Sequence, residues 1–152
     1  MNEITPDLNA YGFSTEIRVR LSETDAVGIV FFGSFAIYFD VGRMDYLAHL
    51  GLTSLDGHVR DLAPGAVVQH HVDFHRPARY NDTLVVFVRV ARLGKTSYTF
   101  HFLVNDKRTR ARVATGSLTL VWLDPDFRPA PIPEPFRRAI REFEGALLDE
   151  PG

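Results

Sequence analysis

A long apolar run between residues 34 and 51 constrains the fold of this chain more than any other feature. It is bounded by Ser34, a residue type that caps the N-termini of helices, and by Gly51, a type that ends helices. The few acidic or basic side chains between them are Asp40, Arg43, Asp45 and His49. A helix with so narrow a polar strip is mostly buried, so we expect it to be wrapped by a sheet or to face a partner.

Alternation of apolar and polar residues predicts the strands of that sheet. The clearest alternation spans residues 13–22, and further strands are expected at residues 66–76, 83–93, 96–104 and 111–123. One face of the 66–76 strand is unusually polar for a core strand. A strand, a buried helix and then four strands joined mostly by short links indicate an α+β fold with an antiparallel sheet.

The 152 residues are expected to form a single domain. Residues 1–12 are predicted to be a loose N-terminal arm, and residues 52–65 a polar loop. Five prolines make residues 125–135 an extended, semi-rigid crossing, and an amphipathic helix is expected at residues 136–148.

Composition excludes several classes of function. A net charge of −2 gives no reason to expect a nucleic acid or an anionic membrane as partner. The absence of cysteine excludes disulfides, thiolate metal sites and a cysteine nucleophile. The acidic N-terminus is unlike a signal peptide, and no run approaches the ~18 apolar residues of a membrane span. We therefore expect a cytoplasmic protein.

Asp25 is the strongest candidate for chemistry because it lies a few residues before the apolar helix. Unpaired N–H groups and the positive dipole end at a helix N-terminus can hold a polarised oxygen. Two interpretations remain open: the aspartate of the TDAVG segment stabilises a turn, or it acts as general base or nucleophile towards an acyl carbon. In the second case, backbone N–H groups near residues 32–34 would donate to the carbonyl oxygen.

The remaining histidines, serines, glycines and lysines give weaker evidence for a functional site. His71 and His75 share a strand face but lie roughly 13 Å apart, and no HExxH motif is present, so no metal site is expected. No GxSxG elbow and no phosphate loop occurs, which argues against triad hydrolases and nucleotide hydrolases. Lys95, in the LGKTS segment between two strands, is either a phosphate contact or a solvated hairpin charge.

Three segments, in order along the chain, resemble the 4-hydroxybenzoyl-CoA thioesterase family of hotdog-fold proteins. They are RVRLSETDAVGIVFFGSFAIYFDVGRMDYL (18–47), VDFHRPARYNDTL (72–84) and GKTSYTFHFLVND (94–106). The resemblance implies a five-stranded antiparallel sheet wrapped around the buried helix. It also implies a homodimer with a continuous sheet, often assembled into a homotetramer, with the active site at the dimer interface.

The resemblance assigns roles to individual residues. Asp25 matches the catalytic carboxylate of the family, and Phe32 matches the residue whose backbone N–H polarises the thioester carbonyl, with the N–H of Gly33 beside it. The segment Lys95, Thr96 and Ser97 falls where the family binds the phosphates of coenzyme A. The apolar residues expected to line the acyl pocket are Ile29, Val30, Phe31 and Phe35.

The sequence thus predicts an acyl-CoA thioesterase that needs no metal or redox cofactor, with coenzyme A as part of the substrate. Related bacterial thioesterases carry a histidine at the Phe32 position and a tyrosine at the Leu21 position, and both polar groups are missing here. An acyl-carrier-protein thioesterase or a dehydratase on the same fold is one alternative. A non-catalytic acyl-CoA binding protein is the other.

Overall fold

A computed structural model of the chain describes residues 3–53 and 65–152. The strands are β1 (Phe13–Arg18), β2 (Ala66–Phe74), β3 (Thr83–Leu93), β4 (Ser97–Asp106) and β5 (Arg112–Val121). The α-helices are α1 (Ser34–His49) and α2 (Glu134–Glu144), and short 3₁₀ helices lie at Leu8–Ala10, Leu21–Glu23 and Gly145–Leu147. Most of the polar loop expected at residues 52–65 lies outside the described residues.

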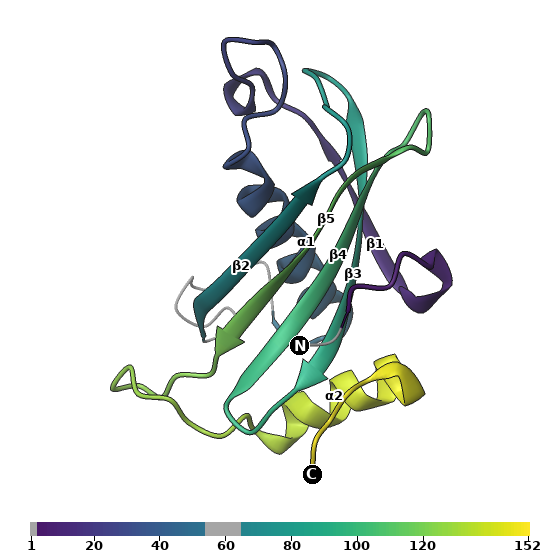
Figure 1. Ribbon diagram of the computed structural model, residues 1–152. Coiled ribbons are helices and arrows are strands. Elements are labelled where there is room, and N and C mark those ends of the chain that lie inside the picture. The colour runs from purple at the N-terminus through teal and green to yellow at the C-terminus, as the bar shows by residue number, and fades with distance from the viewer. Residues whose placement is uncertain (1–2, 54–64) are drawn as a thin grey trace.

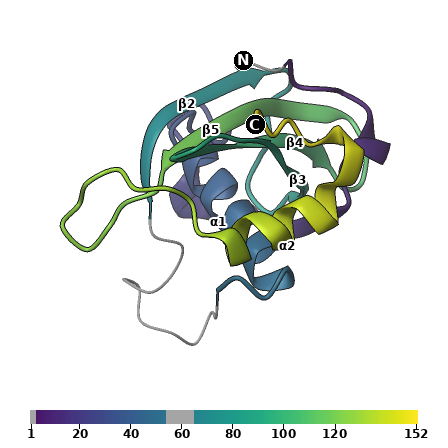
Figure 2. The ribbon, with the colours of Figure 1, turned by 90° about the horizontal axis from the view of Figure 1, so that it is seen from below.

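The strands form one antiparallel sheet in the order β1-β3-β4-β5-β2. The sheet curves around α1, which lies against one of its faces, while α2 crosses one end of the molecule (Figures 1 and 2). Short turns join β3 to β4 and β4 to β5, so these strands form the centre of the sheet and β1 and β2 form its edges. The predicted α+β architecture is confirmed.

Helix α1 is held against the sheet by aromatic stacking and by a close backbone approach. The ring of Phe39 stacks on Phe102 of β4 with ring centroids 4.3 Å apart. At Gly42, a Cβ atom would lie 3.0 Å from a methyl group of Val86 and 3.1 Å from one of Val88. The glycine therefore lets the helix backbone approach β3, and the prediction of a helix wrapped by a sheet is confirmed.

The two ends of α1 differ in how well they were predicted. Gly51 has a φ of +71°, the left-handed conformation that follows a helix end, as its glycine predicted. Ser34 was expected to be the N-cap, but the N-cap is Gly33 and Ser34 is the first helical residue. The hydroxyl of Ser34 instead donates a 3.0 Å hydrogen bond to the carbonyl oxygen of Glu23, which ties the helix to the preceding loop.

The strand predicted at residues 13–22 ends earlier, at Arg18. The chain then bends into the 3₁₀ helix Leu21–Glu23, because the backbone N–H of Arg20 donates a 2.8 Å hydrogen bond to the Glu23 carboxylate. The remaining strands begin and end within two residues of their predicted bounds. This bend brings Asp25 to the end of the sheet where α1 begins.

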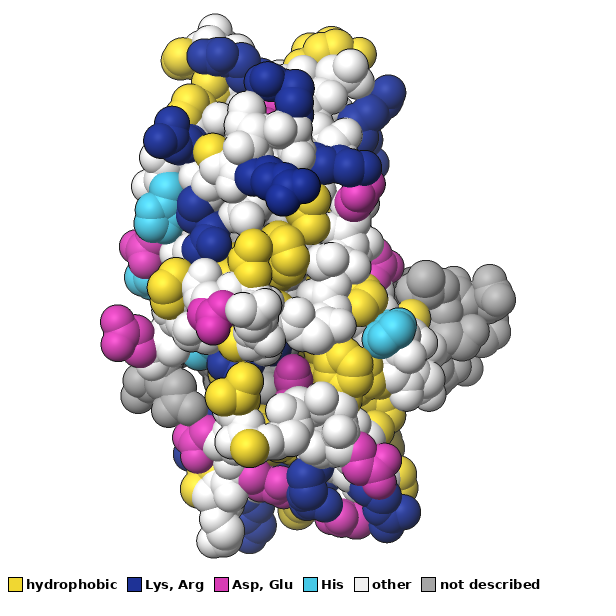
Figure 3. All heavy atoms as spheres, turned by 90° about the vertical axis from the view of Figure 1, so that its right-hand side faces the viewer, with side chains coloured by type: hydrophobic (Ala, Val, Ile, Leu, Met, Phe, Trp, Pro, Cys, Tyr) yellow, Lys and Arg dark blue, Asp and Glu magenta, His cyan; other side chains and the backbone are white. Residues whose placement is uncertain are grey.

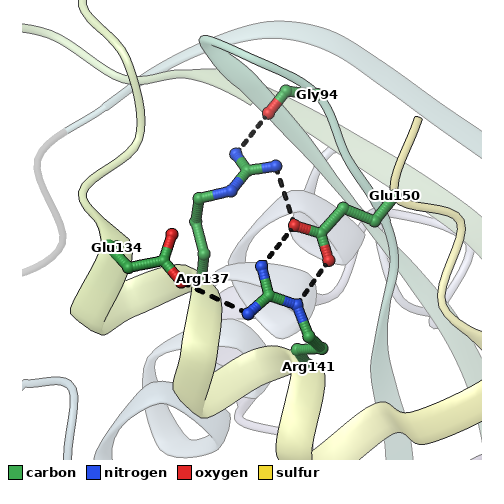
Figure 4. Close-up of polar contacts among 5 residues, drawn as sticks. All are labelled: Gly94, Glu134, Arg137, Arg141 and Glu150. Carbon is green, nitrogen blue, oxygen red and sulfur yellow. Dashed lines mark hydrogen bonds and ion pairs between the residues drawn. The ribbon is translucent and has the colours of Figure 1, made fainter. Parts of the chain in front are cut away.

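The C-terminal segment braces the turn between β3 and β4. Arg137 of α2 donates a 2.6 Å hydrogen bond to the carbonyl oxygen of Gly94 in that turn. Arg137 and Arg141 both hold the carboxylate of Glu150, and Arg141 also contacts Glu134 (Figure 4). The helix expected at residues 136–148 begins earlier, at Glu134, and ends at Glu144 before a glycine with a φ of +64°.

Residues 3–12, the predicted arm, lie on the face of the sheet opposite α1 (Figure 2). The segment includes the 3₁₀ helix Leu8–Ala10 and the buried side chain of Tyr11. The hydroxyl of Tyr11 donates a 3.0 Å hydrogen bond to the carbonyl oxygen of Thr5, and Arg112 of β5 donates one of 3.4 Å to that of Pro6. The first bond holds the segment together, and the second attaches it to the sheet.

Candidate functional site

Asp25 forms a tight turn and lines a cavity. Its carboxylate Oδ1 accepts hydrogen bonds from the backbone N–H groups of Val27 at 2.9 Å and Ile29 at 3.4 Å. The turn closes through a 3.0 Å bond from the Gly28 N–H to the Asp25 carbonyl oxygen, and Gly28 adopts a φ of +92°. Within the described residues, the second carboxylate oxygen, Oδ2, takes part in no hydrogen bond. The two interpretations of Asp25 are therefore compatible, because one oxygen holds the turn and the other is available.

Two backbone amides are also available at the start of α1. The N–H of Phe31 donates to the Glu23 carbonyl oxygen at 2.9 Å, and that of Ser34 donates to the Phe31 carbonyl oxygen at 2.9 Å. Within the described residues, the N–H groups of Phe32 and Gly33 between them donate no hydrogen bond. Free N–H groups at a helix N-terminus, together with the helix dipole, stabilise a negatively charged oxygen.

A cavity of about 490 Å³ brings five of the predicted site residues together. These are Asp25, Ile29, Val30, Phe32 and Phe35, and the opposite wall is made by Phe74, His75, Arg76, Pro77 and Ala78 at the end of β2. A 2.8 Å hydrogen bond from the Val30 N–H to the Ala78 carbonyl oxygen joins the two walls. The cavity therefore places a carboxylate and the Phe32 residue beside an apolar compartment.

The other predicted site residues lie outside this cavity. Phe31 packs its ring on that of Phe32, with centroids 4.4 Å apart, and also covers Gly33, where a Cβ atom would lie 2.7 Å from the Phe31 ring. Lys95, Thr96 and Ser97 lie at the turn from β3 to β4, at the opposite end of the sheet from the loop that precedes α1 (Figure 1).

Glu23 is a buried acid that anchors this site and that the sequence did not single out. Its side chain accepts hydrogen bonds from the Arg20 Nε at 2.9 Å and from the Tyr38 hydroxyl at 3.0 Å, and the residue is only 3% exposed. Burial opposes its ionisation, but the hydrogen bonds from Arg20 and Tyr38 outweigh this effect and hold the pKa of Glu23 below its usual value. Glu23 is thus a structural carboxylate, fully engaged by its neighbours.

Two polar residues of the cavity wall, His75 and Arg76, were also missed. Both follow the last residue of β2, and both are exposed. The His75 Nε2 lies 3.2 Å from the Thr115 hydroxyl oxygen, within hydrogen-bonding distance. The sequence signal that could have identified them is the family resemblance of residues 72–84, because that segment includes the end of this strand.

The fold is that of hotdog thioesterases. A thioesterase of Thermus thermophilus, solved in complex with coenzyme A and Zn, superposes with a TM-score of 0.77 at 29% sequence identity, over 90% of this chain and 97% of that one. The chain belongs to the Thioesterase-like superfamily, whose family model matches residues 19–140. The match contains the Asp25 turn, α1 and the whole cavity.

Curated relatives are distant in sequence. The acyl-CoA thioester hydrolase YbgC of Escherichia coli O157:H7 is 26% identical over 139 residues, covering 90% of this chain and 99% of that protein. The chloroplastic acyl-acyl carrier protein thioesterase ATL3 of Arabidopsis thaliana is 27% identical over 128 residues, covering 84% of this chain and 67% of that protein. A Bacillus subtilis relative, 33% identical over 89 residues, is matched over 63% of its own length.

Within residues 3–53 and 65–152, no group of three or more His, Asp or Glu side chains is arranged to hold a metal ion. Neither of the α-helices found there has the length and apolar character needed to cross a membrane.

Proposed function

We propose that this protein is an acyl-CoA thioesterase of the 4-hydroxybenzoyl-CoA thioesterase type, which hydrolyses a thioester to a free acid and coenzyme A. One observation carries the proposal: a carboxylate with a free oxygen and the start of a helix with free amides meet at one apolar cavity. Thioester hydrolysis needs a nucleophile or base, a donor to the carbonyl oxygen and an apolar pocket for the acyl group.

In the proposed mechanism, the N–H groups of Phe32 and Gly33 donate hydrogen bonds to the thioester carbonyl oxygen and stabilise its charge in the transition state. Asp25 then either attacks the carbonyl carbon or removes a proton from an attacking water. In the covalent route the C–S bond breaks to give a mixed anhydride and the coenzyme A thiolate, and water hydrolyses the anhydride. In the general-base route water adds to the carbonyl carbon directly. The thiolate takes up a proton in both routes.

The apolar wall of the cavity supports an acyl pocket. Ile29, Val30 and Phe35 line it, and the Phe35 ring meets Phe74 edge to face with centroids 5.3 Å apart. Phe31, which packs on Phe32, would close the pocket on the solvent side. The missing histidine and tyrosine of related enzymes do not remove the proposed donors, because a backbone N–H is present whatever the side chain.

We further propose that the protein acts in the cytoplasm as a homodimer or homotetramer with the active site at the dimer interface. Strand β2 supports this, because it lies at the edge of the sheet and every residue of it except Val72 is exposed. An exposed strand edge is a template for pairing with a second chain. Pairing of this kind would also allow the Lys95–Ser97 segment of one subunit to approach the substrate bound by the other.

The decisive experiment measures free thiol released from a panel of short, medium, long and aromatic acyl-CoAs. We expect Asp25→Asn to lower kcat by a factor of ~10² or more with its fold intact. Asp40→Asn is the matched control, since Asp40 is an exposed carboxylate on α1 that pairs with Arg43 at 2.6 Å. Equal rates for wild type and Asp25→Asn would contradict the proposed role of Asp25.

The same panel separates the alternatives. Activity with acyl carrier protein thioesters alone would identify a carrier-protein thioesterase, as the name of the Arabidopsis relative suggests. Tight binding of acyl-CoA by the wild type without any thiol release would identify a binding protein.

A further inference from the structure

A second cavity, of about 330 Å³, adjoins the one that contains Asp25. Arg76 and Pro77 line both cavities, so the two lie next to each other at the end of β2. The residues that line the second cavity are Arg76, Pro77, Arg79, Asp82, Asp106, Arg108, Thr109, Ala111 and Val113. Three arginines thus surround a space beside the proposed thioester site.

The two acids of this cavity hold backbone turns rather than arginine side chains. The Asp82 carboxylate accepts a 2.9 Å hydrogen bond from the backbone N–H of Arg79. The Asp106 carboxylate accepts bonds of 2.8 and 2.9 Å from the N–H groups of Arg108 and Thr109. Within the described residues, none of the guanidinium groups of Arg76, Arg79 and Arg108 takes part in an ion pair, so their donors are available.

The turns that carry these arginines have defined backbone conformations. In the turn after β2, Asn81 has a φ of +71°, and in the β4–β5 turn Arg110 has a φ of +63°. The first turn is also joined to the end of β1, since the Asn81 N–H donates a 3.0 Å bond to the Val19 carbonyl oxygen. The arginines therefore extend from turns fixed by side-chain and backbone hydrogen bonds, which lowers the cost of ordering them around a ligand.

Positive charge is concentrated at this end although the whole chain has a net charge of −2. Figure 3 shows Lys and Arg side chains gathered over the end of the molecule that carries the loop before α1 and the β4–β5 turn. At the other end, Arg137 and Arg141 are neutralised by Glu150 and Glu134 (Figure 4). The arginines beside the Asp25 cavity are thus better placed than those of α2 to attract an anion.

We propose that Arg76, Arg79 and Arg108 form an anion subsite for the phosphate groups of the substrate, on the same chain as Asp25. This proposal rests on the proposed thioesterase function and assigns the polar end of its substrate. Planar guanidinium groups donate paired hydrogen bonds to phosphate oxygens, and the flexible pantetheine arm connects such a phosphate to the thioester sulfur. The shared ligand chemistry is a phosphorylated pantetheine thioester, whether it comes from coenzyme A or from the prosthetic group of a carrier protein.

The test compares substrates that differ only in their phosphates: one acyl group carried on coenzyme A, on phosphopantetheine, on pantetheine and on a holo carrier protein. For Arg79→Gln/Arg108→Gln, we expect KM to rise about 10-fold or more for acyl-CoA, because charge-assisted hydrogen bonds to phosphate are lost. The KM for acyl-pantetheine, which has no phosphate, should not rise with it. A larger effect on coenzyme A than on the carrier protein would identify coenzyme A as the source of the phosphates, and the reverse order would identify the carrier.

Two single variants complete the design. Arg138→Gln removes an exposed arginine of α2 at the far end and should leave every KM unchanged. Lys95→Gln tests the location that the family resemblance suggests. An increase in KM with Lys95→Gln and none with the double arginine variant would overturn the proposal, as would an equal increase for acyl-CoA and acyl-pantetheine.

A calorimetric titration with coenzyme A and with pantetheine measures the subsite without turnover. If the wild type hydrolyses no thioester, the proposed function fails, and this titration still decides the subsite. Tighter binding of coenzyme A than of pantetheine, lost in the double arginine variant and weakened by added salt, is the expected result. Equal affinity of the double variant and the wild type for coenzyme A would contradict the subsite.

Discussion

The hydroxyl of Tyr38 on α1 donates a 3.0 Å hydrogen bond to Oε1 of Glu23, and both residues are buried. The carbonyl oxygen of Glu23 in turn accepts bonds from the Phe31 N–H at 2.9 Å and from the Ser34 hydroxyl at 3.0 Å. Because Glu23 lies two residues before Asp25, this contact positions the Asp25 turn relative to the start of the helix. A buried polar interaction therefore sets the distance between the proposed nucleophile and the proposed donors.

We expect Tyr38→Phe to lower the free energy of unfolding by about 1–2 kcal/mol, because Glu23 loses a donor in a buried site. We also expect kcat for the best acyl-CoA to fall roughly 10-fold, since a small displacement of the Asp25 turn spoils its alignment with the carbonyl carbon. Urea denaturation and thiol release measure the two effects.

Tyr98→Phe is the matched control for this prediction. Tyr98 is also fully buried, but its hydroxyl has no hydrogen-bond partner in the part of the chain that the structure describes. Removing that hydroxyl should change the free energy of unfolding by less than about 1 kcal/mol and leave kcat unchanged. If the two variants behaved alike, the Tyr38–Glu23 bond would have no special role.

Local sequence pattern was sufficient for most of the fold. The apolar run of residues 34–50 and the glycine after it define α1, and alternation places β3, β4 and β5 to within two residues. The pattern failed where a tertiary contact overrides a local preference. Serine is a residue type that favours the N-cap position, but the Ser34 hydroxyl donates its hydrogen bond to the carbonyl oxygen of Glu23. Glu23 belongs to the preceding loop, and the sequence pattern does not predict where that loop lies relative to the helix.

The site residues also fall into those that the sequence pattern could bring together and those that it could not. Asp25 and the start of α1 are close in sequence, so local reasoning could join them. His75 and Arg76 reach the cavity through tertiary contacts, such as the bond from the Val30 N–H to the carbonyl oxygen of Ala78, which joins segments far apart in the chain. The family resemblance included the segment that carries His75 and Arg76, but it did not indicate that this segment lies beside the Asp25 turn. Periodicity predicts which face a residue occupies and gives no information about which strand end meets which helix end.

Glu144, at the end of α2, should make stability depend on pH. Burial raises its pKa from 4.5 to about 7, and the nearby charge of Arg89 opposes this only in part. Between these two values the folded protein holds a proton on Glu144 that the unfolded chain has lost, so the contribution of Glu144 to the free energy of unfolding falls as the pH rises. The whole effect should amount to about 1–3 kcal/mol and be complete above pH 7, since one pKa unit corresponds to ~1.4 kcal/mol.

Glu144→Gln cannot ionise and should remove this part of the slope. Denaturation curves recorded at several pH values between 4.5 and 8 measure it. Glu142→Gln, at an exposed position of the same helix, should keep the wild-type slope. A slope unchanged in the Glu144 variant would show that another group causes the dependence.

Gly116 of β5 should not tolerate a side chain. A Cβ atom there would overlap with the carbonyl oxygen of His71 and would lie 2.5 Å from the Phe39 ring. The ring cannot move away, because it stacks on Phe102 at 4.3 Å. We expect Gly116→Ala to destabilise the fold by about 3 kcal/mol, the upper end of the cost of overpacking. Gly152→Ala, where nothing lies within 4 Å, should be neutral. Equal urea midpoints for the two variants would contradict this packing.

The exposed edge of β2 predicts how copies of the chain associate. Val67 and Val68 are 48% and 60% exposed, and the strand is paired only with β5 in the described structure. Lysine on a strand edge opposes edge-to-edge pairing, because two like charges would meet across the new ladder. We therefore expect Val67→Lys/Val68→Lys to sediment as a monomer under conditions where the wild type sediments as a dimer or tetramer.

Leu147→Lys, which adds a charge at another exposed apolar residue (59%), should keep the wild-type mass. If the site lies at the dimer interface, thiol release should be lost together with the dimer. A monomeric variant with full activity would place the whole active site on one chain, and an unchanged mass would show that assembly does not use this edge.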